Sequence, residues 1–178
     1  MRIISGKYRG RRLVAPDGKD VRPTVDRVKE SLFNILQRDV PDARVLDLFA
    51  GSGSLGIEAL SRGAKEVIFV DASPVSIKTV KANIPPDASG YAVLNKDFRA
   101  AADSFDQPFD IVFLDPPYGS GLAEEAILLL NSKSLIGDGI ICYEHLADYN
   151  YEPPDGLVAF DRRKYGTVAI TFIRKGNN

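Results

Sequence analysis

Short runs of consecutive apolar residues alternate along this chain with segments in which apolar residues recur at helical spacing. A strand that is apolar throughout is typical of a parallel sheet covered on both faces, because neither of its faces meets water. Helical segments are expected between such strands, over residues 54–61, 74–83, 98–104 and 122–131. The alternation predicts an α/β protein with a doubly wound, mostly parallel sheet. The five apolar runs are Val45–Phe49, Val67–Asp71, Tyr91–Leu94, Ile111–Asp115 and Ile140–Tyr143.

The C-terminal part of the chain breaks this alternation. Leu157–Phe160 and Val168–Ile173 are strand-like segments with no helix between them. They predict an antiparallel pair of strands at one edge of the sheet. We expect the sheet and its helices to form one main domain over residues 39–178, preceded by a small extension over residues 1–38.

The extension is predicted to be a β-hairpin followed by a helix. Arg2–Ile4 and Arg11–Val14 are short strand-like pieces that flank a turn-rich stretch. Thr24 or Asp26 can cap the helix that follows. Its expected apolar face consists of Val25, Val28, Leu32, Ile35 and Leu36.

The composition is that of an ordinary globular protein, with 44% apolar and 26% charged residues in a chain of 178. Its longest apolar stretches, such as Ile111–Leu114 and Ala126–Leu130, fall far short of the roughly 20 residues that a membrane span requires. The start Met1–Gly6 turns polar at once, unlike the core of a signal peptide. The one cysteine, Cys142, has no partner for an internal disulfide. We therefore expect a monomer in the reducing cytoplasm.

The net charge of −1 conceals an uneven distribution. Residues 1–38 hold ten Lys and Arg against four Asp and Glu, whereas the remainder holds thirteen against twenty. A basic segment on an acidic body is typical of proteins that bind a polyanion such as RNA. An evenly solvated basic surface is the alternative. The candidate RNA-binding residues are Arg2, Lys7, Tyr8, Arg9, Arg11, Arg12, Arg22 and Arg27.

A glycine-rich turn follows the first predicted strand. Gly51, Gly53 and Gly56 match a G-x-G-x-x-G pattern, and Asp71 ends the second strand, where a carboxylate can accept ribose hydroxyls. This pattern indicates a nucleoside-bearing ligand, or only a tight turn between strand and helix. Asp47 lies beneath the turn and repels a pyrophosphate, so it favours the cationic S-adenosylmethionine over NAD. A carboxylate that caps nearby loop amides is the alternative role for Asp47.

A second pattern, Asp115-Pro116-Pro117-Tyr118, ends the fourth predicted strand. The two prolines fix the backbone and make a stiff ledge at the same sheet edge as the glycine turn. Asp115 and a proline carbonyl can accept hydrogen bonds from an exocyclic amine, while Tyr118 can stack on the base. Two such bonds favour a pyramidal nitrogen with an exposed lone pair, as methyl transfer to that amine requires. The alternative is a Pro-Pro turn that only ends a buried strand.

Asp97 and Phe98 open the helix after the third predicted strand. Asp97 can accept an adenine amino group beside the ring of Phe98, or it can simply cap the helix. His145, the only histidine, is expected to be structural. With one histidine and one cysteine, the sequence predicts no metal site.

The combination of motifs resembles the RsmD family, which methylates guanine N2 in 16S ribosomal RNA of the small subunit. The residues that carry the resemblance are Asp47–Gly53, Asp115–Tyr118, Met1–Gly10, Arg22–Glu30 and Tyr165–Thr167. The resemblance implies a class I methyltransferase with a Rossmann-like sheet, which uses S-adenosylmethionine and acts on 16S rRNA within a small-subunit ribonucleoprotein. It implies Asp115, Pro116, Pro117 and Tyr118 as the catalytic ledge. The implied cofactor-binding residues are Asp47, Phe49, Gly51, Gly53, Asp71, Ala72, Asp97 and Phe98.

Asp71 departs from the family, which often has Glu at this position, and a shorter carboxylate can reach the ribose through a water molecule. Two other functions compete with the one that the resemblance implies. A DNA adenine or cytosine amino-methyltransferase shares the Asp-Pro-Pro-Tyr ledge. A nucleotide-binding oxidoreductase or a non-enzymatic binding domain shares the glycine turn, although Asp47 disfavours NAD.

Overall fold

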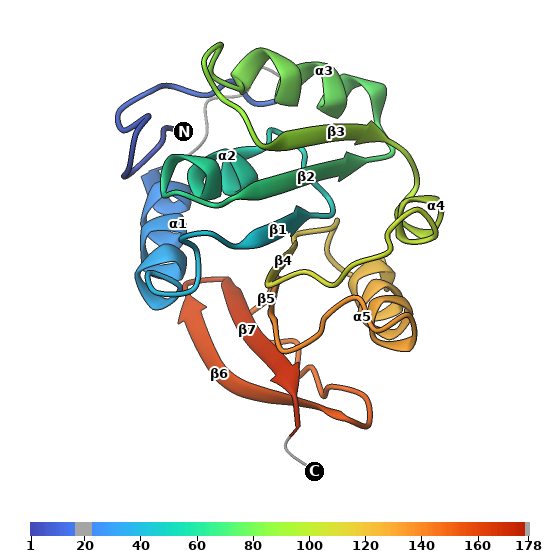
Figure 1. Ribbon diagram of the computed structural model, residues 1–178. Coiled ribbons are helices and arrows are strands. Elements are labelled where there is room, and N and C mark those ends of the chain that lie inside the picture. Colours follow the sequence, from blue (N-terminus) through green and yellow to red (C-terminus); the bar gives the residue numbers. More distant parts are fainter. Residues whose placement is uncertain (17–22, 177–178) are drawn as a thin grey trace.

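The computed structural model describes residues 1–16 and 23–176, and it shows a seven-stranded sheet with helices on both faces (Figure 1). The strands are β1 (Arg44–Asp47), β2 (Glu66–Asp71), β3 (Tyr91–Asn95), β4 (Ile111–Leu114), β5 (Ile140–Leu146), β6 (Leu157–Tyr165) and β7 (Val168–Lys175). The helices are α1 (Pro23–Ile35), α2 (Ser54–Ser61), α3 (Pro74–Asn83), α4 (Phe98–Ala102) and α5 (Leu122–Ser132). The predicted α/β class is confirmed, and each strand and helix predicted within residues 39–178 overlaps an observed one.

The order of the strands places β1 and β4 side by side in the middle of the sheet. The order is β3-β2-β1-β4-β5-β7-β6, with β1 to β5 parallel and β7 antiparallel to both of its neighbours. The chain after β1 leads through α2 to one side of the sheet, and the chain after β4 leads through α5 to the other. Ligands bind α/β sheets at such a reversal, outside the carboxyl ends of the strands.

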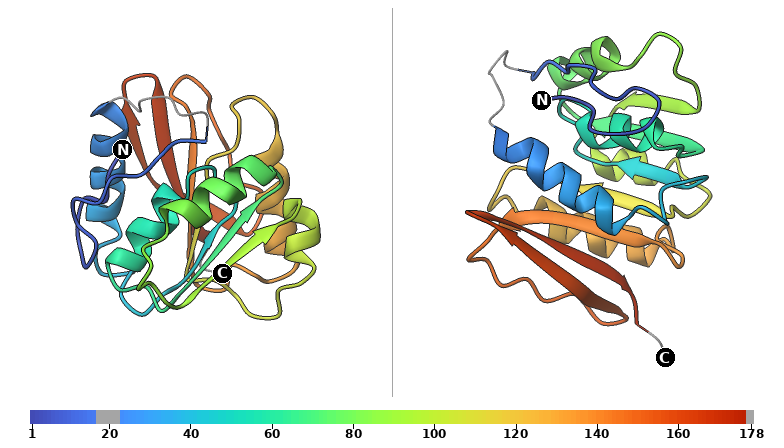
Figure 2. Two further views of the ribbon diagram at one scale, coloured as in Figure 1. Left: turned by 90° about the horizontal axis from the view of Figure 1, so that it is seen from above. Right: turned by 90° about the vertical axis from the view of Figure 1, so that its left-hand side faces the viewer.

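Two apolar clusters hold the helices on opposite faces of the sheet (Figure 2). One contains residues of α1, α2 and α3, and the rings of Phe33 and Phe113 lie 5.5 Å apart within it. The other contains residues of α4 and α5, such as Ala101 and Ile127. All four residues of β4 are buried, as expected for a strand covered on both faces.

The predicted N-terminal hairpin is present as a short antiparallel pairing, but its two segments do not form regular strands. One bridge joins Arg2 and Arg12, and the amides of Ile3 and Leu13 donate to the carbonyl oxygens of Arg11 and Met1 at 2.9 and 3.0 Å. The amides of Ile4 and Ser5 donate to the Glu58 carboxylate at 2.8 and 3.0 Å. The segment is therefore held both by its own backbone hydrogen bonds and by α2.

A buried ion pair joins this segment to α1 and α2. Lys29 and Glu58 are 2% and 0% exposed, and their charged groups lie 3.4 Å apart. The Lys29 ammonium also donates to the carbonyl oxygen of Arg2 at 2.6 Å and to the Ser54 hydroxyl at 3.0 Å. Burial lowers the pKa of Lys29 against the opposing effect of Glu58. These contacts tie the segment to the residue that begins α2.

The predicted caps of α1 are also wrong. The helix begins at Pro23, so Thr24 and Asp26 lie inside its first turn. Proline is favoured at the first helical position because its missing N–H has no partner there in any case. The Asp26 carboxylate instead accepts from the amide of Arg2 at 3.3 Å.

The antiparallel pair at the C-terminal edge is confirmed and is longer than predicted. β6 continues through charged residues to Tyr165, which pairs with Val168. β5 continues to Leu146, which also pairs with Val168. Among the described residues, no helix is both long and apolar enough to cross a membrane.

Candidate active site

A cavity of about 620 Å³ lies at the carboxyl ends of β1, β2 and β4. It brings together ten of the residues that the sequence predicted for the cofactor and the ledge, from four separate loops. Asp47 and Gly53 do not line it. Five lining residues were missed by sequence reasoning: Leu48, Ser73, Ser76, Lys96 and Leu122. The predicted residues that line it are Phe49, Gly51, Asp71, Ala72, Asp97, Phe98, Asp115, Pro116, Pro117 and Tyr118.

The missed residues share a simple signal. Ser73 and Ser76 follow the end of β2, Lys96 follows β3, and Leu122 begins α5. Each lies within a few residues of a strand end or a helix start at the carboxyl edge. Leu48, Ser73 and Lys96 stand directly beside predicted residues, so nearness to a motif is the signal that could have found them.

The glycine turn follows β1 and forms one wall of the cavity. Gly51 and Gly53 have φ of +53° and +76°, a backbone conformation that favours glycine. A Cβ on Gly51 would meet only open space, with the Phe49 carbonyl oxygen 3.9 Å away. A Cβ on Gly53 would instead meet Ile57 and Val80 at 3.3 Å. Gly51 thus faces the cavity, whereas Gly53 lets the turn pack against α3.

The Asp71 carboxylate connects the end of β2 to the glycine turn. Its Oδ2 accepts from the amide of Gly51 at 2.8 Å, and its Oδ1 accepts from the amide of Ser73 at 2.8 Å. Asp71 therefore orients the backbone of the turn as well as lining the cavity. A carboxylate fixed in this way presents its remaining lone pairs to a ligand in one orientation.

Asp47 lies beneath the turn and is 3% exposed. Its Oδ2 accepts from the amide of Gly56 at 2.9 Å. Burial raises the pKa of Asp47 to about 7 despite this bond, and the charge of Asp71 adds to the rise. The alternative role, a carboxylate that binds loop amides, matches this geometry. Any effect of Asp47 on a ligand must act through the charge beneath the turn.

Asp97 and Phe98 form the opposite wall. Asp97 caps α4, because its Oδ1 accepts from the amide of Arg99 at 2.9 Å, and it lines the cavity as well. The ring of Phe98 is 4% exposed and lies 5.6 Å from that of Phe49. Both roles that the sequence suggested for Asp97 are therefore compatible with its position.

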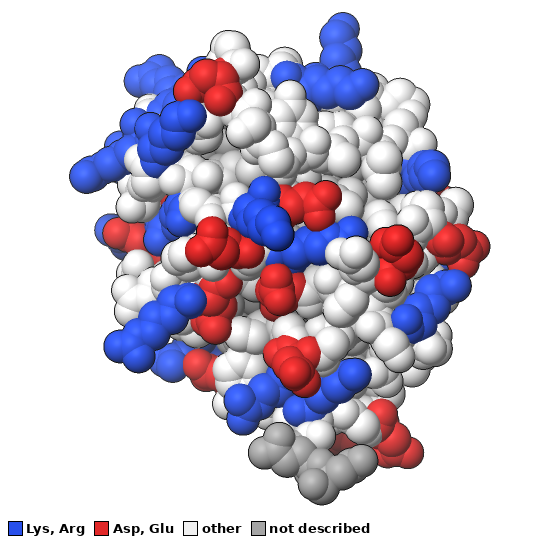
Figure 3. Space-filling view, viewed as in Figure 1, with Lys and Arg blue, Asp and Glu red and all other residues white. Residues whose placement is uncertain are grey.

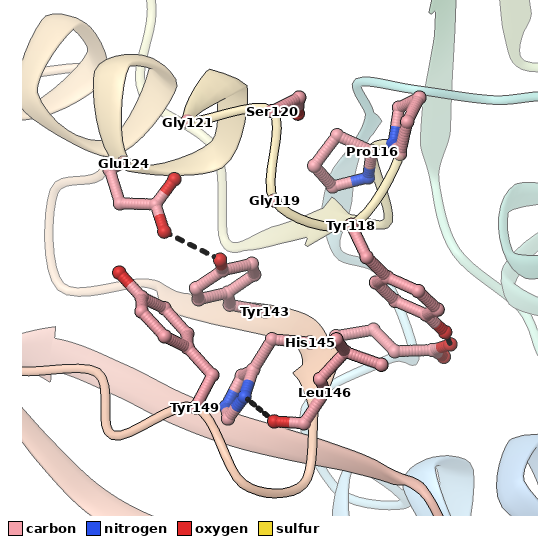
Figure 4. Close-up of a pocket in the computed structure, with 12 residues that line it drawn as sticks. Pro116, Tyr118, Gly119, Ser120, Gly121, Glu124, Tyr143, His145, Leu146 and Tyr149 are labelled. Atoms are coloured by element: carbon pink, nitrogen blue, oxygen red, sulfur yellow. Dashed lines mark hydrogen bonds between the residues drawn. The ribbon is translucent and has the colours of Figure 1, made fainter.

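The ledge Asp115–Tyr118 separates this cavity from a second one of about 370 Å³. Pro116, Pro117 and Tyr118 line both cavities. The second cavity is bounded by the end of β5 and by the loop that carries Tyr149 (Figure 4). Sequence reasoning missed this cavity, because its far wall belongs to β5 and lies more than twenty residues from the ledge.

Glu144 stands beside the ledge in this second cavity. Its Oε1 accepts from the hydroxyl of Tyr118 at 2.8 Å. Desolvation by the surrounding protein raises the pKa of Glu144, opposed by this bond. The side chain of Asp115 opens onto the first cavity. Desolvation by the surrounding protein raises the pKa of Asp115, and the negative charges of Glu144 and Asp47 raise it further. Two carboxylates thus lie at or beside the ledge, and the charge of Glu144 contributes to the raised pKa of Asp115.

Aromatic side chains line the rest of the second cavity. The hydroxyl of Tyr143 donates to the Glu124 carboxylate at 2.7 Å. The ring of His145 lies 4.9 Å from that of Tyr143 and 5.8 Å from that of Tyr149 (Figure 4). Flat walls of this kind suit a planar base.

His145 is engaged within the protein at both ring nitrogens, which agrees with the structural role expected for it. Nδ1 lies 2.8 Å from the carbonyl oxygen of Leu146, which can only accept, so Nδ1 carries the proton. Nε2 then accepts from the hydroxyl of Thr171 at 2.8 Å. Burial lowers the pKa of His145, which favours this neutral form.

The residues predicted to bind RNA lie in different surroundings. Arg2, Arg9 and Arg27 line a polar cavity of about 400 Å³ together with Asp26 and Glu30. The other predicted residues have different surroundings. Lys7 forms an ion pair of 2.9 Å with Asp87, Tyr8 is half-buried, and Arg11 and Arg12 are exposed. Arg22 lies outside the described residues.

Tyr8 is held at the end of α2 that points away from the glycine turn. Its amide donates to the Ser61 hydroxyl at 2.9 Å, and Ser61 is the last residue of α2. A helix of this length separates its two ends by about 12 Å. Lys7 and Tyr8 are therefore about one helix length from the turn, while Arg2 lies near the start of α2.

The size of the first cavity and the chemistry of its lining are compatible with S-adenosylmethionine. Ligand cavities are typically about 300–1,000 Å³. Gly51 leaves open space where a ligand can approach the backbone, and Asp71, Asp97 and Asp115 supply carboxylates for hydroxyl, amine and cationic groups. Among residues 1–16 and 23–176, no group of three His, Cys, Asp or Glu is arranged to hold a metal ion.

Known proteins resemble the chain over almost its whole length. The family described as Conserved hypothetical protein 95 matches residues 1–174. "Putative rRNA methyltransferase YlbH" of Bacillus subtilis is 40% identical over 98% of this chain and 99% of its own length. "Ribosomal RNA small subunit methyltransferase D" of Escherichia coli is 42% identical over 80% of this chain and 73% of its own length. The solved structure of "Putative methyltransferase yhhF" from Escherichia coli superposes with a TM-score of 0.88 at 35% identity and covers 98% of this chain and 97% of its own.

Proposed function

Because this chain belongs to the Conserved hypothetical protein 95 family, the RsmD family that its motifs resemble, we propose that it methylates a guanine of 16S ribosomal RNA. The methyl donor is S-adenosylmethionine, and the acceptor is the exocyclic N2 amine of the guanine. The names of its relatives support a methyltransferase of ribosomal RNA. The two cavities on either side of the ledge support the choice of base.

The observation that carries the choice of guanine is the pair of carboxylates beside the ledge. Guanine presents two neighbouring donors on one edge, the N1–H and the N2 amine, whereas adenine and cytosine present an amine next to an acceptor nitrogen. Asp115 and Glu144 offer acceptors to both donors when they are ionised. The hydroxyl of Tyr118 occupies Oε1 of Glu144, and no other described group donates to Oε2. A wall made of acceptors therefore favours guanine.

The first cavity holds the methyl donor in this proposal. Asp71 binds the ribose, while Asp97 and Phe98 bind the adenine. Asp47 contributes a buried negative charge beneath the turn, which favours a cationic ligand. When bound, S-adenosylmethionine supplies a methyl group on a sulfonium, which is already a good leaving group.

The ledge prepares the target amine. Asp115 and the carbonyl oxygen of Pro116 accept hydrogen bonds from the two N–H groups of the amine. These two hydrogen bonds favour a pyramidal nitrogen, whose lone pair is then exposed to the methyl group. The rings of Tyr118 and Tyr143 hold the base in the second cavity. The amine gives up one proton after the new bond has formed, and water takes it. Positioning supplies most of the catalysis in such a reaction.

The substrate presents the target base as part of a folded ribonucleoprotein. Apart from the loops that connect strands and helices, the described residues add only a short N-terminal segment to the sheet and its helices. A guanine must leave its stack to enter the second cavity, which costs a few kcal/mol. Structured RNA that already exposes the base lowers this cost, and basic residues of the N-terminal segment offset the rest by binding phosphates.

The proposal is tested by transfer of a tritiated methyl group from S-adenosylmethionine to 16S rRNA, both naked and assembled with small-subunit proteins. We expect the label in N2-methylguanosine after digestion to nucleosides, and more of it from the assembled particle. An Asp115→Ala variant gives the background. Label in methylated adenine or cytosine of DNA supports the competing amino-methyltransferase. Binding of NAD but not S-adenosylhomocysteine in calorimetry contradicts both.

A further inference from the structure

The edge strand β6 brings three basic residues to the same edge of the sheet as the candidate active site. Tyr165 at the end of β6 and Leu146 at the end of β5 both pair with Val168 of β7. The two strands therefore end at the same level. Arg162, Arg163 and Lys164 precede Tyr165 directly and are all exposed.

Two of these residues share a face of the sheet with the second cavity. Lys164 pairs with Ala169, which pairs with His145 of the cavity wall. Arg162 pairs with Thr171, which pairs with Tyr143 in the same wall. Side chains of directly paired residues point to the same face, and neighbouring strands lie about 4.8 Å apart. The backbone of Lys164 is thus about 10 Å from that of His145.

Arg162 and Lys164 differ in what holds them. The guanidinium of Arg162 donates to the carbonyl oxygens of Ala147 and Tyr149, both at 3.0 Å. Arg162 therefore fixes the loop that carries Tyr149, and its other donors remain available. No described acidic side chain forms an ion pair with Lys164, whereas Arg163 pairs with Asp161 at 2.9 Å. Of these three basic residues, Lys164 is the one whose charged group has no described protein partner, so its ammonium can bind a ligand.

The charge of β6 and β7 contrasts with the rest of the main domain. Residues 157–175 contain five Lys and Arg against one Asp, whereas residues 39–156 contain eight against nineteen Asp and Glu. Figure 3 shows Lys and Arg side chains, with Asp and Glu between them, over the lower part of the molecule, where β6 and β7 lie in Figure 1. The net charge of residues 39–178 is negative because the acidic residues of 39–156 outnumber the basic residues of β6 and β7.

We propose that Lys164 and Arg162 form a phosphate-binding surface for the RNA strand that flanks the target base, an inference that rests on the proposed function. A base seated in the second cavity leaves its backbone at the mouth of that cavity, next to the edge strand. Lysine and arginine neutralise phosphates there and make binding depend on salt. The RNA thus contacts both ends of the chain, the N-terminal segment and the C-terminal hairpin.

Basic residues on an edge strand have another use, since they discourage pairing with the edge of a second molecule. The experiment must therefore separate RNA binding from edge protection. Lys164→Ala is compared with Lys175→Ala, which removes the same charge at the opposite end of the hairpin, where Lys175 pairs with Leu157. Lys164→Arg restores the charge at the first position.

RNA affinity is measured against salt concentration for wild type and the three variants, together with methyl transfer and S-adenosylhomocysteine affinity. One lost phosphate contact lowers the slope of log affinity against log salt by about 0.7–0.9. We expect this change for Lys164→Ala, with a KM for RNA raised several-fold and kcat within twofold. Lys175→Ala and Lys164→Arg should keep the slope of wild type, and cofactor affinity should not change in any variant.

The outcomes separate this inference from the proposed function. If wild type methylates RNA and Lys164→Ala keeps its salt slope and KM, the phosphate-binding surface is wrong and edge protection explains the lysine. If Lys175→Ala matches Lys164→Ala, the effect is one of overall charge, and the surface is again wrong. If wild type neither binds nor methylates ribosomal RNA, the proposed function itself is overturned.

Discussion

The hydroxyl of Tyr118 donates a hydrogen bond of 2.8 Å to Oε1 of Glu144, so the ledge after β4 is tied to a carboxylate near the end of β5. Sequence reasoning gave Tyr118 only a stacking role for its ring. The bond adds a second role for its hydroxyl, because it orients the carboxylate that faces the edge of the base. A hydrogen bond to a charged group contributes about 1.5–3 kcal/mol.

Removing the hydroxyl of Tyr118 should lower the rate of methyl transfer, while the ring that contacts the base is kept. We expect Tyr118→Phe to reduce kcat/KM about tenfold, equivalent to about 1.4 kcal/mol. Tyr118→Ala should reduce it further and weaken RNA binding as well, because the ring face is lost. Steady-state kinetics with rRNA measure both variants. Activity equal to wild type in Tyr118→Phe contradicts the orienting role.

The dependence of methyl transfer on pH should report the pair of carboxylates. Asp115 accepts hydrogen bonds from N–H groups more strongly when it is ionised, and its pKa is raised by desolvation and by Glu144. Activity should therefore fall as the pH is lowered through that raised pKa. Glu144→Gln removes the nearest negative charge, which lowers the pKa of Asp115 and moves the acid limb to lower pH. Glu124→Gln is the control, because Glu124 binds Tyr143 in the same cavity. An acid limb that does not move in Glu144→Gln contradicts the coupling.

Replacing Asp115 should separate catalysis from cofactor binding. Asp115→Ala removes an acceptor for the target amine, so we expect methyl transfer to be lost. The affinity for S-adenosylhomocysteine should stay within a few fold of wild type, because Asp71, Asp97 and the glycine turn are unchanged. Calorimetry and tritiated transfer measure the two properties. A variant that loses cofactor affinity as severely as activity would show that Asp115 serves the cofactor.

Asp47 should lower stability at neutral pH. Its pKa rises from 3.8 to about 7 on folding, so the folded protein keeps this proton at a pH where the unfolded chain has lost it. Lowering the pH from 8 to 4 therefore favours the folded state at this site. Asp47→Asn should stabilise the free protein at pH 8, by at most about 4 kcal/mol, and have little effect at pH 4.

Urea unfolding at the two pH values measures this effect, and the same variant should bind S-adenosylhomocysteine more weakly. The gain in stability and the loss of affinity have one cause, the removal of a buried negative charge. A variant less stable than wild type at pH 8 contradicts the prediction. Unchanged affinity limits Asp47 to a structural role beneath the turn.

Glu58 should be needed for the attachment of the N-terminal segment. It is fully buried, pairs with Lys29 and Arg62, and accepts from the amides of Ile4 and Ser5. Glu58→Ala leaves a buried ammonium without its partner, which costs about 3–5 kcal/mol. We expect a lower free energy of unfolding in urea and faster tryptic cleavage after Arg9 and Arg11.

The matched control is Glu66→Ala, in which a half-exposed carboxylate loses an ion pair with Arg44. Exposed pairs contribute at most about 1 kcal/mol, so this variant should be almost as stable as wild type. Equal destabilisation by the two substitutions contradicts the special role of Glu58.

The sequence by itself determined the elements and the ends of the strands that matter. Residues 111–114 are apolar throughout and form a strand that is buried on both faces. A polar side chain on either face of such a strand would lose its contact with water, so an uninterrupted apolar run predicts burial on both faces. The helices 54–61 and 74–83 were predicted with the observed bounds. The glycine turn and the ledge were found because glycine and proline impose a backbone conformation that depends on no distant residue.

Only the tertiary structure decided which groups share a site. Tyr118 and Glu144 are 26 residues apart, and their bond depends on β4 and β5 being neighbours, which no local pattern states. The amide of Ile4 donates to the carboxylate of Glu58, 54 residues further along the chain, and no local pattern predicts this contact. Lys164 reached the active-site edge through the register of three strands. Local sequence fixes backbone preference and burial, whereas contacts between distant segments depend on the packing of the whole sheet.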